Sequence, residues 1–218
     1  GDATFDYAVS SASSPALNAA SFSKLPATRL TSESWTFRGK EEDVLFSKLS
    51  ANAVRLLDLP ADMSRGSSTG DDEVFVVDVS DAHRFERGIL RTPLFASDFG
   101  RFRFRPSDKW RIIYPYVQDG AHYRTYEEHE LRTRFPKAYA YLQEHQQRLK
   151  RRKQFRQWYA FSAPRNLALH ESAQIAVPLL ADRGLFALVP SDARGRLCPM
   201  ASGGFTISLS PGCAVAPE

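Results

Sequence analysis

Apolar residues recur at helical spacing after an acidic stretch near the start of the chain. Leu45, Leu49 and Leu56 lie at intervals of four and seven residues. The three acidic residues at 41–43 precede them and favour the positive end of a helix dipole. This pattern predicts a helix over roughly 40 to 54.

A second apolar stripe follows Pro136, a residue type that suits the first position of a helix. Tyr139, Leu142 and Leu149 continue this stripe as far as about Trp158. The pattern predicts the longest helix of the chain, roughly 20 residues or about 30 Å in length. Because it includes a run of cations, we expect a long basic helix.

Alternating and continuous apolar runs predict strands elsewhere. The RFRFR segment, 101–105, alternates strictly, so its phenylalanines and its arginines should face opposite sides of a strand. A turn separates it from WRIIYPY, 110–116, and the two segments predict a hairpin with a cationic face. Residues 74–79 predict another strand, and short apolar runs punctuated by Pro, Gly, Asp and Arg follow Pro164.

These elements predict an α+β domain with two helices and several antiparallel strands. Residues 10–34 are rich in Ser, Ala and Pro without helical or alternating apolar spacing, which is typical of a linker. The predicted division is therefore a linker over 1–34 and a folded domain over 35–218. Because the sequence opens on Gly1 and its first methionine is Met63, we interpret the chain as a piece of a longer protein.

Charge is unevenly distributed along the chain. The 218 residues are 43% hydrophobic and carry a formal charge of +4, a bias too mild to identify a partner. From Glu41 to Leu90, five Lys/Arg stand against eleven Asp/Glu, a balance of −6. From His122 to Arg165, eleven stand against four, a balance of +7. The folded molecule should therefore have two sides of opposite charge.

Several classes of site find little support in the sequence. Cys198 and Cys213 form no C-x-x-C pair, which argues against a disulfide framework or structural zinc and favours a reducing, cytoplasmic compartment. No apolar run approaches the length of a membrane span, so we expect no membrane partner. The GSSTGDDE segment lacks the G-K-[ST] ending of a phosphate loop, and dinucleotide, zincin and serine-hydrolase motifs do not occur. The acids at 71–73 and 127–130 are better explained as turn and helix-start charges than as metal ligands or proton-transfer groups.

The segment LKRRKQFRQWYAFSAPRN, 149–166, combines six cationic side chains with four aromatic ones. We expect the aromatic rings to pack inside, because buried tryptophan and tyrosine are common. The four consecutive cations at 150–153 would spread around most of a helix and cannot all pair with nearby Glu144. Such a run gains from counterion release on a phosphate backbone, although a merely solvated helix face is the alternative.

Two more cationic segments leave alternatives open. The arginines of 101–105 recur at about 6.6 Å intervals, roughly the spacing of adjacent phosphates, but arginine also protects exposed edge strands. The SRGSSTG segment, 64–70, contains glycines that can take positive φ. It forms either a tight structural turn, which we favour, or a site where backbone amides and Arg65 hold a phosphate.

Six segments follow one another in a characteristic order. They are a segment around Trp35, the LFSKL…LLDL helix, SRGSSTGDDEVFVVD, WRIIYPY, FPKAYAYLQEHQQRLKRRKQFRQWYAFSAPRN and QIAVPLLADRGLFAL. This order resembles the target-recognition region of TaqI-like N6-adenine DNA methyltransferases, including the fused restriction-modification enzymes of type IIG. The resemblance runs from about Trp35 to the C-terminus.

Three groups of residues match the family's motifs. They are Gly66, Thr69, Gly70 and Phe75 in the G-x-x-T-G turn and following strand, Tyr114, Pro115 and Tyr116 in the aromatic-Pro-Tyr strand end, and Trp158, Tyr159, Pro164, Arg165 and Asn166 in the W-Y…P-R-N segment. Base-reading residues in this family lie on variable loops, so the resemblance does not supply the recognised DNA sequence.

The resemblance implies a specificity domain that grips and reads duplex DNA. In the family, a separate catalytic domain binds S-adenosylmethionine and flips the target adenine with an Asn-Pro-Pro-aromatic motif. This sequence has neither that motif nor a glycine-rich cofactor loop. We therefore expect no catalytic residue, metal or cofactor in this chain, and we expect S-adenosylmethionine in the catalytic domain of the full-length protein. Residues 1–34 would be the tail of the junction with that domain, and Glu218 would precede further family helices.

We expect the DNA contacts to come from three groups of residues. These are Arg65, Ser67, Ser68 and Thr69 in the turn, Arg101, Arg103 and Arg105 in the predicted hairpin, and Lys150, Arg151, Arg152, Lys153, Arg156, Arg165 and Asn166 in the basic segment. Two other functions remain open: a protein-interaction module that docks on a catalytic domain, and a stand-alone nuclease, for which no convincing D…E-x-K arrangement is present.

Overall fold

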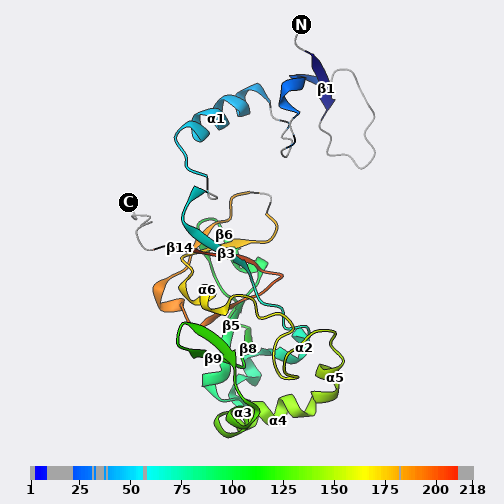
Figure 1. The fold of residues 1–218 in the computed structure, drawn as a ribbon, viewed down its shortest axis with the longest axis vertical. Helices are drawn as coiled ribbons and strands as arrows, with labels where there is room; N and C mark the ends of the chain where they lie inside the picture. The colour runs from blue at the N-terminus through cyan, green and yellow to red at the C-terminus, as the bar shows by residue number, and fades with distance from the viewer. Residues whose placement is uncertain are drawn as a thin grey trace. The chain divides into compact units, whose positions relative to one another are not determined.

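The computed structural model describes residues 3–8, 22–30, 32, 37, 39–55, 58–181 and 183–210. The chain forms two compact units, Gly1–Arg55 and Leu56–Glu218 (Figure 1). The division therefore falls after Arg55, whereas the sequence places the end of the linker at residue 34.

The smaller unit begins with a two-stranded sheet. Strands β1 (Thr4–Ala8) and β2 (Phe22–Pro26) pair antiparallel, and the short 3-10 helix η2 (Ala27–Arg29) follows. The rings of Phe5, Tyr7 and Phe37 pack together, with the Tyr7 and Phe37 centroids 5.2 Å apart. The sequence pattern predicts a linker in this region, whereas the structure contains a hairpin. The pattern misses the hairpin because its two strands are far apart in sequence and carry few strongly apolar residues.

The predicted first helix is confirmed as α1 (Lys40–Ala51). Glu42 accepts a hydrogen bond from the Gly39 amide at 3.2 Å, and Asp43 forms an ion pair with Arg29 at 2.6 Å. Both acids lie in the first turn of α1, where the helix dipole stabilises negative charge. The apolar residues Val44, Leu45 and Leu49 are each 58–59% exposed.

The larger unit contains two four-stranded sheets. The first is antiparallel throughout, in the order β12 (Ala187–Leu188), β11 (Ile175–Pro178), β14 (Gly204–Leu209) and β3 (Ala61–Arg65). The second has the order β13 (Leu197–Pro199), β5 (Leu90–Leu94), β8 (Trp110–Ile113) and β4 (Val76–Asp78), in which β13 and β5 alone are parallel. The antiparallel pairs confirm the α+β class.

Short elements connect and flank these sheets. Two further hairpins pair β6 (Phe99–Gly100) with β7 (Arg103–Phe104), and β9 (Tyr116–Asp119) with β10 (His122–Thr125). The helices are α2 (Asp72–Phe75), α3 (Glu128–Arg134), α4 (Pro136–Glu144), α5 (Gln146–Lys150) and α6 (Leu167–Ser172), with 3-10 helices η4 (Val79–Arg84), η5 (Arg87–Ile89), η6 (Ala96–Asp98) and η7 (Ser191–Ala193). In Figure 1, α3, α4 and α5 gather at one end of this unit. The predicted strand at 74–79 is confirmed only for β4, because α2 precedes it and η4 follows it.

The predicted hairpin between 101–105 and 110–116 is wrong. The arginine-rich segment instead pairs with the strand that precedes it, β6, while β8 lies between β5 and β4. Phe102 has a φ of 63° and lies in the connection between β6 and β7, so strand geometry in this segment is limited to Arg103–Phe104. Arg101, Arg103 and Arg105 therefore do not form the continuous face of one strand.

The predicted long basic helix is also wrong. Helices α3, α4 and α5 follow one another, with breaks at Phe135 and His145, and the last of them ends at Lys150. Phe135 precedes a proline and has a φ of −135°, because the proline ring disfavours the helical conformation of the residue before it. The predicted apolar stripe nevertheless exists: Leu142 and Leu149 are fully buried.

Arg152 explains why the chain leaves the helix within its cationic run. Its guanidinium donates to four backbone carbonyls, those of Leu149 at 2.9 Å, Thr69 at 2.6 Å, Ala160 at 2.9 Å and Trp158 at 2.6 Å. These bonds fold the segment after α5 back over its own end and attach it to the glycine-rich turn. The pKa of Arg152 is lowered from its usual value, because its guanidinium is partly buried.

Aromatic rings form the centre of the core. The Phe161 ring contacts those of Phe75, Tyr114 and Tyr116, with centroids 5.2, 6.1 and 5.2 Å away. The Phe161 amide also donates to the Tyr116 hydroxyl at 2.7 Å. The Tyr159 hydroxyl donates to the Tyr126 carbonyl at 2.9 Å. The segment after the glycine-rich turn, the WRIIYPY segment and the segment after α5 therefore meet in one core, and the hydroxyls of Tyr116 and Tyr159 are hydrogen-bonded within it.

Helix α6 packs against β14, β3 and β10. On one side, Glu171 forms an ion pair with Arg91 of β5, whose guanidinium lies 3.7 Å from the centre of the Tyr114 ring. On the other, His170 is buried, and its Nδ1 lies 2.6 Å from the Thr206 hydroxyl of β14. Burial lowers the pKa of His170 to about 4.

Replacing Arg152 should destabilise the larger unit. Arg152→Met keeps an apolar stem but removes four hydrogen bonds to backbone carbonyls, so the free energy of unfolding should fall by about 3 kcal/mol. Urea unfolding measures this change, with the exposed neighbour Lys150→Met as the matched control, expected to stay within about 0.5 kcal/mol of wild type. Equal effects of the two variants would contradict the role given to Arg152.

His170 should make stability depend on pH. Its pKa is about 4 in the folded chain and 6.5 in the unfolded chain, so the unfolded state binds the proton first as the pH falls. The free energy of unfolding should therefore decrease between pH 7.5 and 4.5, by about 2 to 3 kcal/mol from this residue. Urea unfolding at both pH values should show a smaller decrease for His170→Gln than for wild type. An unchanged decrease would exclude His170 as its source.

Candidate nucleic-acid interface

The SRGSSTG turn uses its hydroxyl groups inside the protein. Ser67 and Thr69 are fully buried. The Ser67 hydroxyl donates to the Pro164 carbonyl, and the Thr69 hydroxyl donates to the Asp72 carboxylate and accepts from the Asp71 amide. These two side chains hold the turn in place, and they present no surface to a ligand in this structure.

The two glycines of the turn are required by close packing. A Cβ at Gly66 would overlap the Met200 backbone carbonyl. Gly70 has a φ of +78°, and a Cβ there would overlap the Ser162 side chain. The turn is therefore wedged between two later segments of the chain, as the structural interpretation of its sequence predicts.

The same turn supports the Pro164-Arg165-Asn166 segment. Ser68 and Ala163 exchange two backbone hydrogen bonds of 2.8 and 3.0 Å. The Arg165 Nη1 donates to the Gly66 carbonyl at 3.0 Å, and the Asn166 Nδ2 donates to the Ser64 hydroxyl at 3.2 Å. Arg165 and Asn166 are both exposed beyond these bonds. The turn thus acts as a platform that presents these two side chains.

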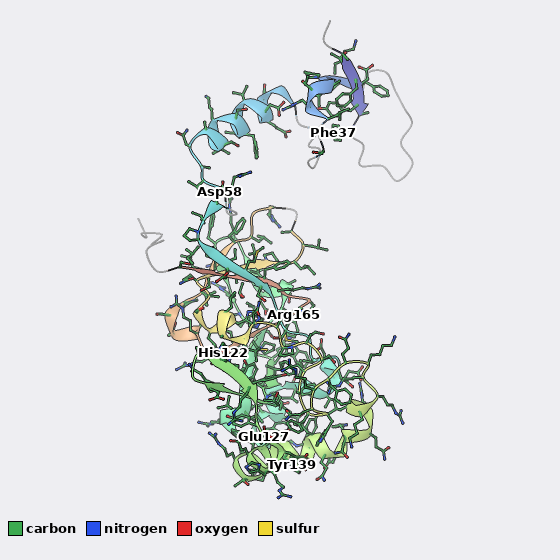
Figure 2. The ribbon with its side chains drawn as sticks, in the orientation of Figure 1. Phe37, Asp58, His122, Glu127, Tyr139 and Arg165 are labelled. Carbon is green, nitrogen blue, oxygen red and sulfur yellow. The ribbon has the colours of Figure 1, made fainter. Side chains whose placement is uncertain are left out.

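A groove of about 900 Å³ opens beside this platform. Its lining comes from β3, the β9–β10 hairpin, the segment after α5 and the start of α6: Asp62, Met63, Tyr116, His122, Tyr123, Arg124, Thr125, Glu127, Arg156, Gln157, Pro164, Arg165, Asn166, Leu167, Ala168 and Leu169. The labels of Arg165, His122 and Glu127 in Figure 2 mark three points on its walls. Three of the predicted DNA-binding residues, Arg156, Arg165 and Asn166, therefore meet in one groove.

A second hollow of about 510 Å³ continues the groove toward the end of α5. Both hollows are lined by Glu127, Arg156 and Gln157. The second adds Lys150 and the Phe155 ring, which is 37% exposed. We call the two hollows together the basic groove. Their linings together extend from Lys150 to the Pro164-Arg165-Asn166 segment, called the PRN segment below.

The cations of this region differ in how they are paired. Within the described residues, Lys150, Arg156 and Arg165 form no ion pair. Arg124 is held by Glu130 at 2.6 Å, and this hydrogen bond lowers the pKa of Glu130 to about 2. Arg148 outside the groove pairs with Asp71 and Glu73, which raises its pKa. Three cations without an ion pair in the described part of the chain therefore line the groove, together with the carboxylates of Asp62, Glu127 and Glu128.

The other predicted residues lie apart from the groove lining. Arg151 and Lys153 are exposed beside the end of α5, whereas Arg152 is occupied by its four carbonyls. The Arg65 Nε donates to the Ala201 carbonyl at 3.1 Å. Arg101, Arg103 and Arg105 are exposed around the β6–β7 hairpin, and none of them lines either hollow. The structure thus separates the hairpin arginines from the basic segment.

The groove residues that were not anticipated from the sequence include His122, Tyr123, Arg124 and Gln157. The first three lie on β10. The available sequence signal for the β9–β10 hairpin was Gly120, which forms its tight turn with a φ of 61°. Gln157 is notable because its Oε1 is buried with no hydrogen-bond partner in the described part of the chain. The residue lines both hollows.

The remaining comparisons give no independent evidence on this site, so its assignment rests on the geometry described above. Among the described residues, no group of three or more His, Cys, Asp or Glu side chains is arranged to hold a metal ion. No helix in the described ranges is both long and apolar enough to span a membrane. A scan against protein-family models finds no match to this chain, and a search of curated proteins finds none either.

Proposed function

We propose that this chain is a target-recognition domain that binds duplex DNA for an N6-adenine DNA methyltransferase. The observation that carries the proposal is the basic groove, along which Lys150, Arg156 and Arg165 have no carboxylate partner among the described residues. A duplex presents a regular array of phosphates. Cations spread along one open groove gain free energy when they release the counterions of such an array.

The family resemblance supports the same site. The segments that carry it include the glycine-rich turn and the W-Y…P-R-N segment, and these build one wall of the groove and the platform beneath it. A domain that grips DNA needs a rigid scaffold for its contact residues. The buried hydroxyls of the turn and the aromatic core provide that rigidity.

In this proposal the chain binds and reads DNA but does not carry out methyl transfer. S-adenosylmethionine and the catalytic step belong to a separate catalytic domain of the same enzyme, which is the expected protein partner. The exposed Val44, Leu45 and Leu49 of α1 favour a second role in contact with another protein surface, since exposed apolar patches mark such contacts. The two roles coexist, and a cytoplasmic location follows from the DNA substrate.

Binding to duplex DNA should depend steeply on salt. If about six phosphates are neutralised, affinity should fall by about three orders of magnitude between 50 and 200 mM salt. Fluorescence anisotropy with the 218-residue chain and a labelled duplex measures this dependence. Affinity that hardly changes with salt would instead indicate an apolar docking surface.

Removing the exposed cations around the groove should weaken binding to all duplexes equally. The variant changes Lys150, Arg151, Lys153 and Arg156 to Ala and leaves Arg152, which holds the fold, intact. Each lost phosphate contact should reduce the slope of log affinity against log salt by about 1.

The matched control changes four exposed cations that line neither hollow, Arg87, Lys109, Arg132 and Lys137, to Ala. It removes the same formal charge, so it should reproduce the general electrostatic loss without the change in slope. Equal slopes for the two variants would refute the groove as the DNA site.

A further inference from the structure

The β6–β7 hairpin ends in an exposed aromatic ring. Gly100 and Arg103 pair across the hairpin, so Arg101 and Phe102 form its two-residue turn. Phe102 is 69% exposed, which makes it the most exposed aromatic side chain among the described residues. A ring of this size in water forfeits most of the free energy that its burial would supply. The turn therefore places an apolar side chain in solvent at the tip of the hairpin.

The same ring is held on strained backbone. Phe102 has a φ of 63°, in the left-handed region where bulky residues are rarely found. Hairpin turns that need a positive φ normally place glycine or asparagine there, because these residues adopt it at little cost. Phe102 therefore lowers stability twice, through its exposure and through its backbone. A residue that does so is a candidate for function, since asparagine or glycine would remove both costs.

Three arginines without acidic partners surround the ring. Arg101, Arg103 and Arg105 are exposed, and none of them forms a side-chain hydrogen bond or an ion pair within the described ranges. The Arg101 guanidinium carbon lies 5.3 Å from the centre of the Phe102 ring. Asp98, the acid beside β6, is buried, and its carboxylate accepts a hydrogen bond from a backbone amide at 2.8 Å. The hairpin tip therefore combines an apolar ring with positive charge, which is complementary to a polyanion.

The hairpin lies at the edge of a sheet whose opposite edge forms part of the basic groove. Phe102 forms an isolated bridge to Ala187 of β12, the edge strand of the sheet β12-β11-β14-β3. At the other edge, Asp62 and Met63 of β3 line the groove. Because neighbouring strands lie about 4.8 Å apart, Phe102 is separated from β3 by about 19 Å along the sheet. One turn of B-form DNA measures about 34 Å, so both contacts fit within one turn of a single duplex.

We propose that the β6–β7 hairpin is a second DNA contact, in which the Phe102 ring inserts between adjacent base pairs while the three arginines hold the phosphates beside it. The inference rests on the proposed DNA-binding function and adds to it a bend of the duplex. An inserted apolar side chain unstacks one base step and kinks the duplex by about 20 to 90°. Residues 101–105 lie outside the segments that carry the family resemblance, as expected for a contact on a variable loop.

The proposed insertion implies a preference for flexible DNA. Steps in which a pyrimidine precedes a purine unstack and kink most readily. The hairpin should therefore favour duplexes that contain such steps, without any hydrogen bond to their bases.

Three variants separate insertion from other roles of the hairpin. Phe102→Asn removes the ring and suits a positive φ, so thermal unfolding should place it at or above the wild-type midpoint. Phe102→Met keeps an apolar side chain that can enter a base step. Leu188→Asn is the matched control, because Leu188 is 62% exposed on the neighbouring strand β12 but lies outside the turn.

The experiment uses the 218-residue chain and two duplexes of equal length that carry an energy-transfer pair at their ends. One duplex has several pyrimidine–purine steps at its centre, and the other has purines alone on one strand. Fluorescence anisotropy measures affinity, and energy transfer measures bending. Wild type should bind the flexible duplex about 10-fold more tightly and should increase its energy transfer. Phe102→Asn should lose the preference and the bend, whereas Phe102→Met and Leu188→Asn should keep most of both.

Each other outcome overturns a stated part of the proposal. A preference and bend that persist in Phe102→Asn, or wild type that binds both duplexes without bending them, overturn the insertion and leave DNA binding standing. The exposed tip would then be a protein contact. Equal losses in Phe102→Asn and Leu188→Asn also overturn the insertion, because they assign the effect to a broader apolar surface. Failure of wild type to bind either duplex overturns the proposed function together with the insertion.

Discussion

The larger unit depends on a single cation placed among backbone carbonyls. The guanidinium of Arg152 joins the end of α5, the segment after it and the glycine-rich turn through four hydrogen bonds of 2.6 to 2.9 Å. A charged donor shared by several carbonyls forms stronger bonds than neutral pairs do. It reinforces the backbone and hydroxyl bonds that join the turn to residues 162–164. This partly buried guanidinium therefore helps to fix the segments that line the groove.

Around this centre, the protein uses its positive charges in two ways. Arg91, Arg124, Arg148 and Arg152 satisfy carboxylates or carbonyls of the chain itself. Lys150 and Arg156 have no such partner among the described residues. Arginine serves the first role well because its planar fork binds two or more acceptors at once.

At the groove, a strained backbone conformation in the PRN segment depends on the rigid turn beneath it. Two left-handed residues persist at the PRN segment because the turn below it is fixed by buried hydroxyls and by glycines that admit close packing. If the turn were loose, the backbone would relax to a commoner conformation. A rigid platform beneath these polar side chains keeps each of them in one orientation.

The sequence by itself determined the α+β class, α1, the buried stripe of Leu142 and Leu149, and the structural nature of the glycine-rich turn, because local spacing and backbone freedom decide these features. It misassigned the partner of 101–105, since strand pairing depends on contacts between distant residues and on the positive φ of Phe102. It also treated 150–153 as one cationic helix face, because a linear count cannot show that Arg152 turns inward. Asp71 and Glu73 lie more than seventy residues from Arg148 in sequence, and only the tertiary structure brings these opposite charges together and leaves the groove cations unpaired.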